Sequence, residues 1–295
     1  MAQFSVGENK VEAGEVLRLP AGAIHAAHRF GRTAARRRPV LLADRSDLTA
    51  SFAPDDLLHD WRATAPVARD SVRPRLFEEV AAARAQIRAQ VERFGPELVQ
   101  SGLLALLELR QPDTYAHSCR VARSAGLLAG AMGAGADETA LIRKAALFHD
   151  IGKVAVPQRL LYRSGRLNDD EVAVMRLHVS IGAELVAEVP SLQKAAAIIG
   201  ATHERFDGSG YPNHLAAEDI PRGARIITLA DSFDAMVTRR TYSDPMTQSD
   251  ALAELRRCAG AHFDPAAVSA WLQIMAPSSG PSLEPAGRRV PVAVR

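Results

Sequence analysis

Two short segments of the chain combine residues that could bind a metal ion. Residues 149–153 have the sequence HDIGK, in which a histidine and an aspartate are adjacent and a lysine follows the aspartate by three residues. Residues 203–212 have the sequence HERFDGSGYP, in which a histidine precedes a glycine-rich turn. Imidazole and carboxylate groups suit divalent ions such as iron, manganese or zinc, and a carboxylate can bridge two ions. We therefore expect a metal site with Asp150 as its bridging ligand.

The geometry expected for residues 149–153 places this site at the end of a helix. Adjacent side chains on a helix diverge by about 100°, so His149 and Asp150 can reach one metal cluster only where the helix ends. Gly152 favours an end at this point. Lys153 lies one helical turn from Asp150, and its amine can contact a phosphate without competing for the metal. The segment is therefore compatible with a metal site that has a cationic side chain beside it.

Together, the two motifs resemble the signature of the HD-GYP family, bacterial proteins with an all-helical, metal-dependent phosphohydrolase fold whose characteristic substrate is cyclic di-GMP. The resemblance covers roughly residues 103–276, and residues 175–182, 230–236 and 263–265 are also close to the family's form. It implies divalent metal ions as cofactors, two in number, with iron or manganese favoured. It also implies six metal ligands by position: His117, His149, Asp150, His178, His203 and Asp231.

The same resemblance implies which residues act on the substrate. Asp150 and Lys153 would be catalytic, and Lys153, Asp234 and Arg240 would bind the substrate. The reaction expected is hydrolysis of cyclic di-GMP to the linear dinucleotide and then to GMP, with cationic side chains offsetting charge on the phosphate oxygens. Tyr211 could stack on guanine or pack inside the protein, and the sequence favours neither.

Three positions deserve comparison with the family's pattern. Thr202 stands where the family has a histidine ligand, and a threonine hydroxyl is a poor ligand unless it is deprotonated. Ser243 stands where members often have a basic residue, and the absence of that residue would weaken a phosphate contact. Asp113 lies four residues before His117, where some members have a glutamate ligand, but the helix dipole also favours an aspartate there. We leave Asp113 out of the predicted ligands.

Three functions are compatible with this pattern. We prefer a metal-dependent phosphodiesterase acting on cyclic di-GMP, because most of the ligands and the phosphate-binding cations are present. The alternative is a catalytically impaired HD-GYP module that acts as a cyclic di-GMP receptor or a protein-interaction domain. A phosphohydrolase acting on other nucleotides is the third, and the intact glycine-rich segment at residues 203–212, here called the GYP loop, argues against it. Gly208 and Gly210 would let this loop approach the substrate or a partner, such as another cyclic di-GMP signalling protein.

The spacing of apolar residues predicts an all-α fold, an HD-type helical bundle, with a small N-terminal module of uncertain, mixed structure. We expect this module at residues 1–75, a connecting or dimer-forming helix at 76–100, the HD-GYP domain at 101–276 and a loose tail at 277–295. Helical segments are expected at residues 74–94, 96–109, 113–132, 137–150, 169–188, 191–205, 223–239, 248–259 and 264–276.

Two of these helices have clear start signals. Asn168 and Glu171 have the spacing of a capping box, and Asp264 precedes a proline at the first helical position. In the N-terminal module, the arginines at 36–38 are more typical of a solvated face than of a nucleic-acid site, because few aromatic residues accompany them.

Composition narrows the remaining possibilities. Hydrophobic residues make up 47% of the chain and charged residues 24%, as in ordinary globular proteins. The net charge of +2 gives no support to nucleic-acid binding. Cys119 and Cys258 are too few for a disulfide framework. No apolar run approaches the roughly 20 residues that span a bilayer, so we expect a cytoplasmic protein without a membrane partner.

Overall fold

The computed structural model describes residues 69–163, 165–238 and 245–276. Residues 39–273 form one compact unit, and residues 1–38 with 274–295 form a second, of which only residues 274–276 are described. Most of the predicted N-terminal module, the predicted tail, Arg240 and Ser243 therefore lie outside the described residues.

The described residues are helical and contain no strand, apart from an isolated bridge between Ala259 and Phe263. The predicted all-α fold is therefore confirmed. The α-helices are α4 (Arg69–Phe94), α5 (Pro96–Arg110), α6 (Pro112–Ala131), α7 (Ala136–Phe148), α8 (Gln158–Leu161), α9 (Asp169–Ala187), α10 (Gln193–Ile199), α11 (Arg222–Val237), α12 (Gln248–Arg257) and α13 (Pro265–Met275). Two 3₁₀ turns are η1 (Ile151–Ala155) and η2 (Ala217–Asp219).

Local sequence explains where several helices begin. Helices α5, α6 and α13 each start at a proline, whose missing N–H has no partner to lose in the first turn. At the start of α9, the Asn168 side chain accepts a hydrogen bond from the Glu171 N–H (2.9 Å), and the Glu171 carboxylate accepts one from the Asn168 N–H (2.9 Å). The predicted capping box is therefore confirmed. The Asp264 carboxylate likewise accepts from the Ala266 N–H (2.8 Å) at the start of α13.

The predicted helix at residues 191–205 is too long at both ends. Helix α10 ends at Ile199, and tighter turns follow in which Thr202 N–H donates to the Ile199 carbonyl and Glu204 N–H to the Ala201 carbonyl. Donors then bond to carbonyls three residues back instead of four, which is how many helices finish. His203 consequently lies in a turn after the helix.

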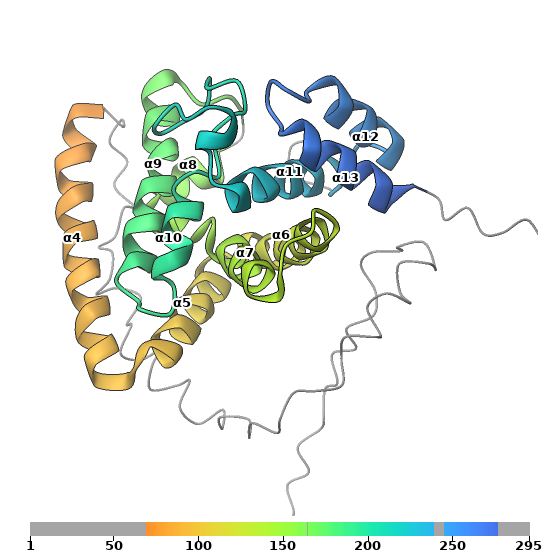
Figure 1. Cartoon of the computed structure of the whole chain (residues 1–295). Coiled ribbons are helices and arrows are strands. Elements are labelled where there is room, and N and C mark those ends of the chain that lie inside the picture. Colours follow the sequence, from red (N-terminus) through yellow and green to blue (C-terminus); the bar gives the residue numbers. More distant parts are fainter. Residues whose placement is uncertain (1–68, 164, 239–244, 277–295) are drawn as a thin grey trace, which may run out of the picture. The chain divides into compact units, whose positions relative to one another are not determined.

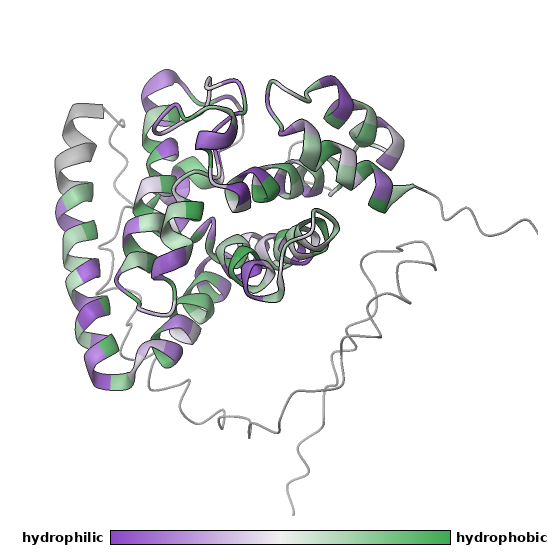
Figure 2. Cartoon of the chain, in the orientation of Figure 1, coloured by the Kyte–Doolittle hydropathy of each residue, from purple (hydrophilic) through white to green (hydrophobic). Residues whose placement is uncertain are grey.

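Two groups of helices form the described core, with α9 and α6 at their centres. Helix α9 packs against α4, α10 and η1, while α6 packs against α5, α7 and α11 (Figure 1). Figure 2 shows hydrophobic and hydrophilic residues on the same helices. Fully buried side chains such as Leu128, Ile142, Phe148, Ile199 and Ile226 fill the space between them. None of the helices in the described ranges is both long and apolar enough to cross a membrane.

Candidate functional site

The structure brings the predicted metal ligands together from five segments that are far apart in the sequence. His117, His149 and Asp150 form one triad, and Asp150, His178 and His203 form another. Within each triad the candidate ligand atoms all lie within 4.8 Å of one another. Asp150 belongs to both triads, which is the position required of a carboxylate that bridges two ions. The sixth predicted ligand, Asp231, has its Oδ1 2.9 Å from His117 Nε2.

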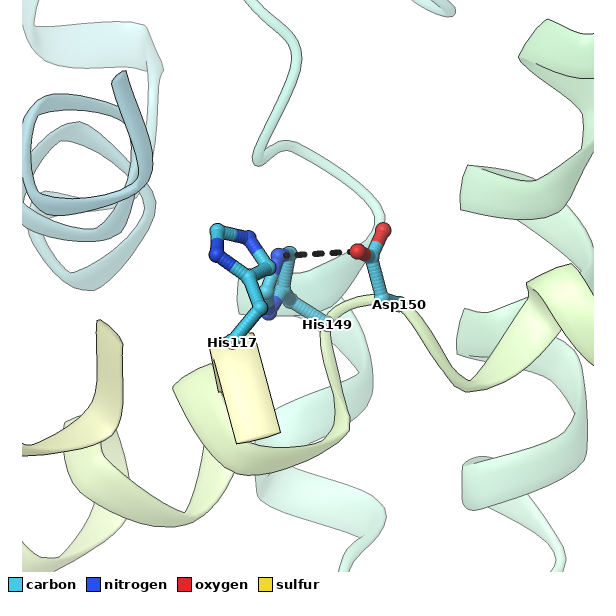
Figure 3. Close-up of side chains that lie close together, drawn as sticks. All are labelled: His117, His149 and Asp150. Atoms are coloured by element: carbon cyan, nitrogen blue, oxygen red, sulfur yellow. Dashed lines mark ion pairs between the residues drawn. The ribbon is translucent and has the colours of Figure 1, made fainter. Parts of the chain in front are cut away.

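The first triad lies where α6 meets the end of α7. Figure 3 shows its three side chains, with a dashed line between His149 and Asp150. His149 Nε2 lies 3.5 Å from Asp150 Oδ2. Helix α7 ends at Phe148. His149 and Asp150 therefore follow the helix, and their side chains need not point in different directions as those of adjacent residues within a helix do. The predicted helix at 137–150 is thus two residues too long at its C-terminus. His149 and Asp150 are almost fully buried, with 1% and 2% of their surface exposed.

Three of the four histidines are held through Nδ1. His149 Nδ1 lies 2.7 Å from the Ala146 carbonyl and His178 Nδ1 lies 2.6 Å from the Met175 carbonyl. His117 Nδ1 lies 2.7 Å from Asp234 Oδ2. An Nδ1–H that donates to such an oxygen leaves Nε2 unprotonated in a neutral imidazole, with its lone pair available to a metal. The donor set therefore fits a divalent cation.

In the second triad, two histidine nitrogens and a carboxylate oxygen also lie close enough together to bind a cation. His178 Nε2 and His203 Nε2 lie 3.2 Å apart, and His178 Nε2 lies 3.5 Å from Asp150 Oδ1. Burial is the main reason that the pKa of His178 falls to about 4, and burial also lowers the pKa of His203. Both rings are therefore neutral at pH 7 without a metal.

The first triad has the opposite electrostatic character. Burial alone would lower the pKa of His117, but its hydrogen bonds to Asp231 and Asp234 outweigh burial and raise the pKa to about 9. Burial alone would raise the pKa of Asp150, but Lys153 and the surrounding histidines lower it well below its ordinary value. Lys153 Nζ lies 2.6 Å from Asp150 Oδ2, so the predicted phosphate-binding amine contacts the shared carboxylate directly.

Gly152 allows η1 to approach α9 closely. A Cβ at this position would lie 2.0 Å from the His178 carbonyl oxygen and 2.6 Å from the Gly182 nitrogen. No side chain fits there without moving the backbone that carries His178. From the sequence, Gly152 was expected only to end a helix, and the structure adds this close contact between η1 and α9.

The GYP loop folds back on the turn that holds His203. A Cβ at Gly210 would lie 2.3 Å from the Arg205 nitrogen, so the close approach expected of this glycine is to the loop's own backbone. The Tyr211 ring stacks on His203 with 5.1 Å between centroids and an interplanar angle of 9°, and the Arg176 guanidinium lies 4.8 Å from the Tyr211 centroid. Of the two roles left open for Tyr211, the structure shows packing within the protein.

Thr202 and Asp113 belong to neither triad. Thr202 is buried, and its hydroxyl donates to the Ile199 carbonyl (2.9 Å), while its own carbonyl accepts from the Thr228 hydroxyl (2.8 Å). Its side chain is thus committed to the end of α10 and does not replace the family's histidine. Asp113 is exposed in the first turn of α6, where the helix dipole favours it.

Asp234 is held within the protein on both of its carboxylate oxygens. Oδ2 accepts from His117 Nδ1 (2.7 Å) and Arg120 Nη2 (2.9 Å), and Oδ1 accepts from Arg120 Nε (2.8 Å). The family resemblance implied that Asp234 binds the substrate, and it gave no role to Arg120. The available signal was the spacing of three residues between His117 and Arg120, which places them on one face of a helix.

Comparison with known proteins agrees with this geometry. The family described as "HD domain" matches residues 103–267. The chain is 41% identical, over 59% of its length, to the cyclic di-GMP phosphodiesterase response regulator RpfG of Xanthomonas campestris, and covers 46% of that protein. It is 40% identical, over 60% of its length, to the 3'3'-cGAMP-specific phosphodiesterase 2 of Vibrio cholerae, and covers 34% of it.

A third relative is a cyclic di-GMP phosphodiesterase of Thermotoga maritima, with 39% identity over 57% of this chain and 46% of the relative. The chain therefore spans between about a third and a half of the length of these relatives. Both triads lie within residues 103–267, the segment that the family matches. Together with the ligand geometry, these similarities support the binding of divalent metal.

Replacing Gly152 with alanine tests the contact between η1 and α9. We expect Gly152→Ala to lower the free energy of unfolding by about 1–3 kcal/mol, the usual range for overpacking, and to weaken metal binding through His178. Gly130→Ala is the matched control, because a Cβ at Gly130 meets nothing within 4 Å. Urea unfolding and Mn²⁺ titration of both variants provide the measurement. Equal stability of the two variants would contradict the assigned contact.

The opposite protonation of the two triads predicts that metal uptake by the first triad depends on pH. Below pH 9, His117 carries a proton in the metal-free protein, and a metal ion must displace it. Affinity at this triad should therefore rise about tenfold per pH unit between pH 7 and 9, with one proton released per ion. The second triad has no such proton to lose at pH 7. Calorimetry with Mn²⁺ in buffers of different ionisation enthalpy would measure the release, and its absence at pH 7 would refute the assignment.

Proposed function

Because this chain belongs to the HD domain family and carries an HD-GYP domain, we propose that it is a phosphodiesterase that hydrolyses cyclic di-GMP with the help of divalent metal ions. The single observation that carries the proposal is the sharing of Asp150 between two triads. Two adjacent cation sites joined by a carboxylate are the arrangement used for in-line displacement at phosphorus. Both triads lie within the segment that matches the HD domain family, and relatives named as phosphodiesterases of cyclic dinucleotides support this activity.

Two ions, with iron or manganese favoured by the mixed imidazole and carboxylate ligands, are proposed for this site. His117, His149 and Asp231 would hold one ion and His178 and His203 the other, with Asp150 in common. When bound, such ions polarise a phosphoryl oxygen and make water a better nucleophile at neutral pH.

The protein's own side chains would prepare the site for a phosphodiester. The backbone contacts of His149 and His178 fix the direction of their Nε2 atoms before any ligand arrives. Lys153 balances the charge of Asp150 and, with 27% of its side chain exposed, remains able to reach a phosphate oxygen. Arg240, outside the described residues, is proposed as a second cation for the substrate. The products would be the linear dinucleotide and then GMP.

The second candidate function is a cyclic di-GMP receptor without turnover. The observation that favours it is Thr202. The hydroxyl of this residue is bound to the Ile199 carbonyl, so a ligand supplied by residue 202 in the resembled family is lost. Neither triad requires that ligand, however, since each has three protein donors of its own. Because each triad keeps three protein donors, the enzyme is favoured over the receptor. We further propose that the protein is bacterial and cytoplasmic, that it forms a homodimer, and that a signalling partner binds at its GYP loop.

Turnover by the full chain tests the proposal directly. Protein purified without oxygen and saturated with Mn²⁺ should cleave cyclic di-GMP, and Asp150→Ala should abolish both activity and metal binding because both triads lose a ligand. Thr202→Val is the control: it should retain activity and lose about 1 kcal/mol of stability with the missing hydrogen bond. The same assay with 3'3'-cGAMP tests substrate choice. An inactive wild type at saturating Mn²⁺ would leave the receptor as the better function.

A further inference from the structure

The helices α6 and α11 each present a pair of polar residues spaced by three. On α6 the pair is His117 and Arg120, and on α11 it is Asp231 and Asp234. Residues three apart lie on one face of a helix, and α6 packs against α11. The two pairs therefore interlock, with His117 between both aspartates: Nε2 lies 2.9 Å from Asp231 Oδ1 and Nδ1 lies 2.7 Å from Asp234 Oδ2.

We propose that Arg120 and Asp234 are positioning residues that orient His117 toward the metal, and that Asp234 does not bind the substrate. The proposal rests on the metal binding of the proposed function but is independent of which substrate is cleaved. It replaces the role that family resemblance implies for Asp234 and gives a role to Arg120.

The contacts of Asp234 leave it little capacity for a substrate. Only 6% of its surface is exposed, and both oxygens already accept hydrogen bonds. A buried carboxylate would also repel the phosphates of a cyclic dinucleotide. Its partner Arg120 is well suited to hold it in place, because the planar guanidinium donates through Nε and Nη2 to two carboxylate oxygens at once.

This fixed carboxylate determines what His117 can do. Once the ion displaces the second ring proton, an Nδ1–H that donates to Asp234 Oδ2 leaves the Nε2 lone pair on the side of Asp231, where the first triad would hold its ion. Without Arg120, Asp234 would be a buried charge with one partner fewer, free to turn away from the imidazole.

His117 differs in this respect from the other anchored histidines. His149 and His178 bond to carbonyls three residues earlier in their own segments, so each is oriented locally. His117 is oriented by a side chain 117 residues away, on a different helix. Its direction therefore depends on the packing of α6 against α11, and a change at Asp234 or Arg120 should reach the metal without removing any ligand.

The test separates metal affinity from substrate affinity in the full chain. We expect Asp234→Asn and Arg120→Met each to weaken Mn²⁺ binding by about 10- to 100-fold, the usual effect of removing a group that orients a ligand. At saturating Mn²⁺, the KM for cyclic di-GMP should stay at the wild-type value. Arg123→Met is the matched control on the same helix, because Arg123 is exposed, and it should change neither quantity.

The double variant Asp234→Asn/Arg120→Met provides a second measurement. If the two residues act as a unit, the double variant should bind Mn²⁺ no more weakly than the single variant that has the lower Mn²⁺ affinity. Normal Mn²⁺ affinity with a raised KM in folded Asp234→Asn would overturn the proposal and return Asp234 to the substrate.

Arg120→Lys, which keeps the charge but cannot donate through two nitrogens in the same geometry, serves if Arg120→Met fails to fold and should bind Mn²⁺ with intermediate affinity. Wild-type affinity in Arg120→Lys would also count against the proposal. These metal titrations remain decisive even if the wild type shows no turnover, because they do not require the reaction.

Discussion

The buried carboxylate of Asp150 is the charge around which the described site is arranged. Only 2% of its surface is exposed, and an ionised carboxylate in such a place is costly unless it is paired. Lys153 and the nearby histidines supply the compensation, and they lower the pKa of Asp150 well below its ordinary value. The same arrangement that makes the carboxylate tolerable in the core also places nitrogen donors on both of its sides.

Close backbone packing is the second condition, because the ligands come from separate elements. Asp150 leaves the end of α7, while His178 lies within α9, and η1 must reach α9 for the two to meet. Gly152 makes that contact possible, since any Cβ would overlap the carbonyl of His178 itself. The absence of a side chain at Gly152, two residues after Asp150, is thus a condition for bringing Asp150 and His178 together. This explains why the glycine belongs to the same short motif as the ligands.

The sequence predicted the parts of the fold that depend on local chemistry. Prolines and the capping box at Asn168 set helix starts within a few residues, and apolar periodicity identified the all-α class. The ends were less accurate: His149 and His203 both lie beyond helices that were expected to include them. Local propensity does not determine where a helix stops when the following turn is fixed by distant packing, as it is for η1.

The candidate ligands were likewise predicted from the sequence, because the motifs that resemble the HD-GYP family contain them. Their supports were not, since Arg120 and Tyr211 look like ordinary charged and aromatic residues until α11 and the loop at 203–212 are placed beside them. The two triads differ in how far along the chain their supporting residues lie. His203 stacks on a ring eight residues further along the chain, whereas His117 depends on contacts across two helices. Loss of local order in the loop would therefore affect the second triad first, while a shift between α6 and α11 would affect the first triad.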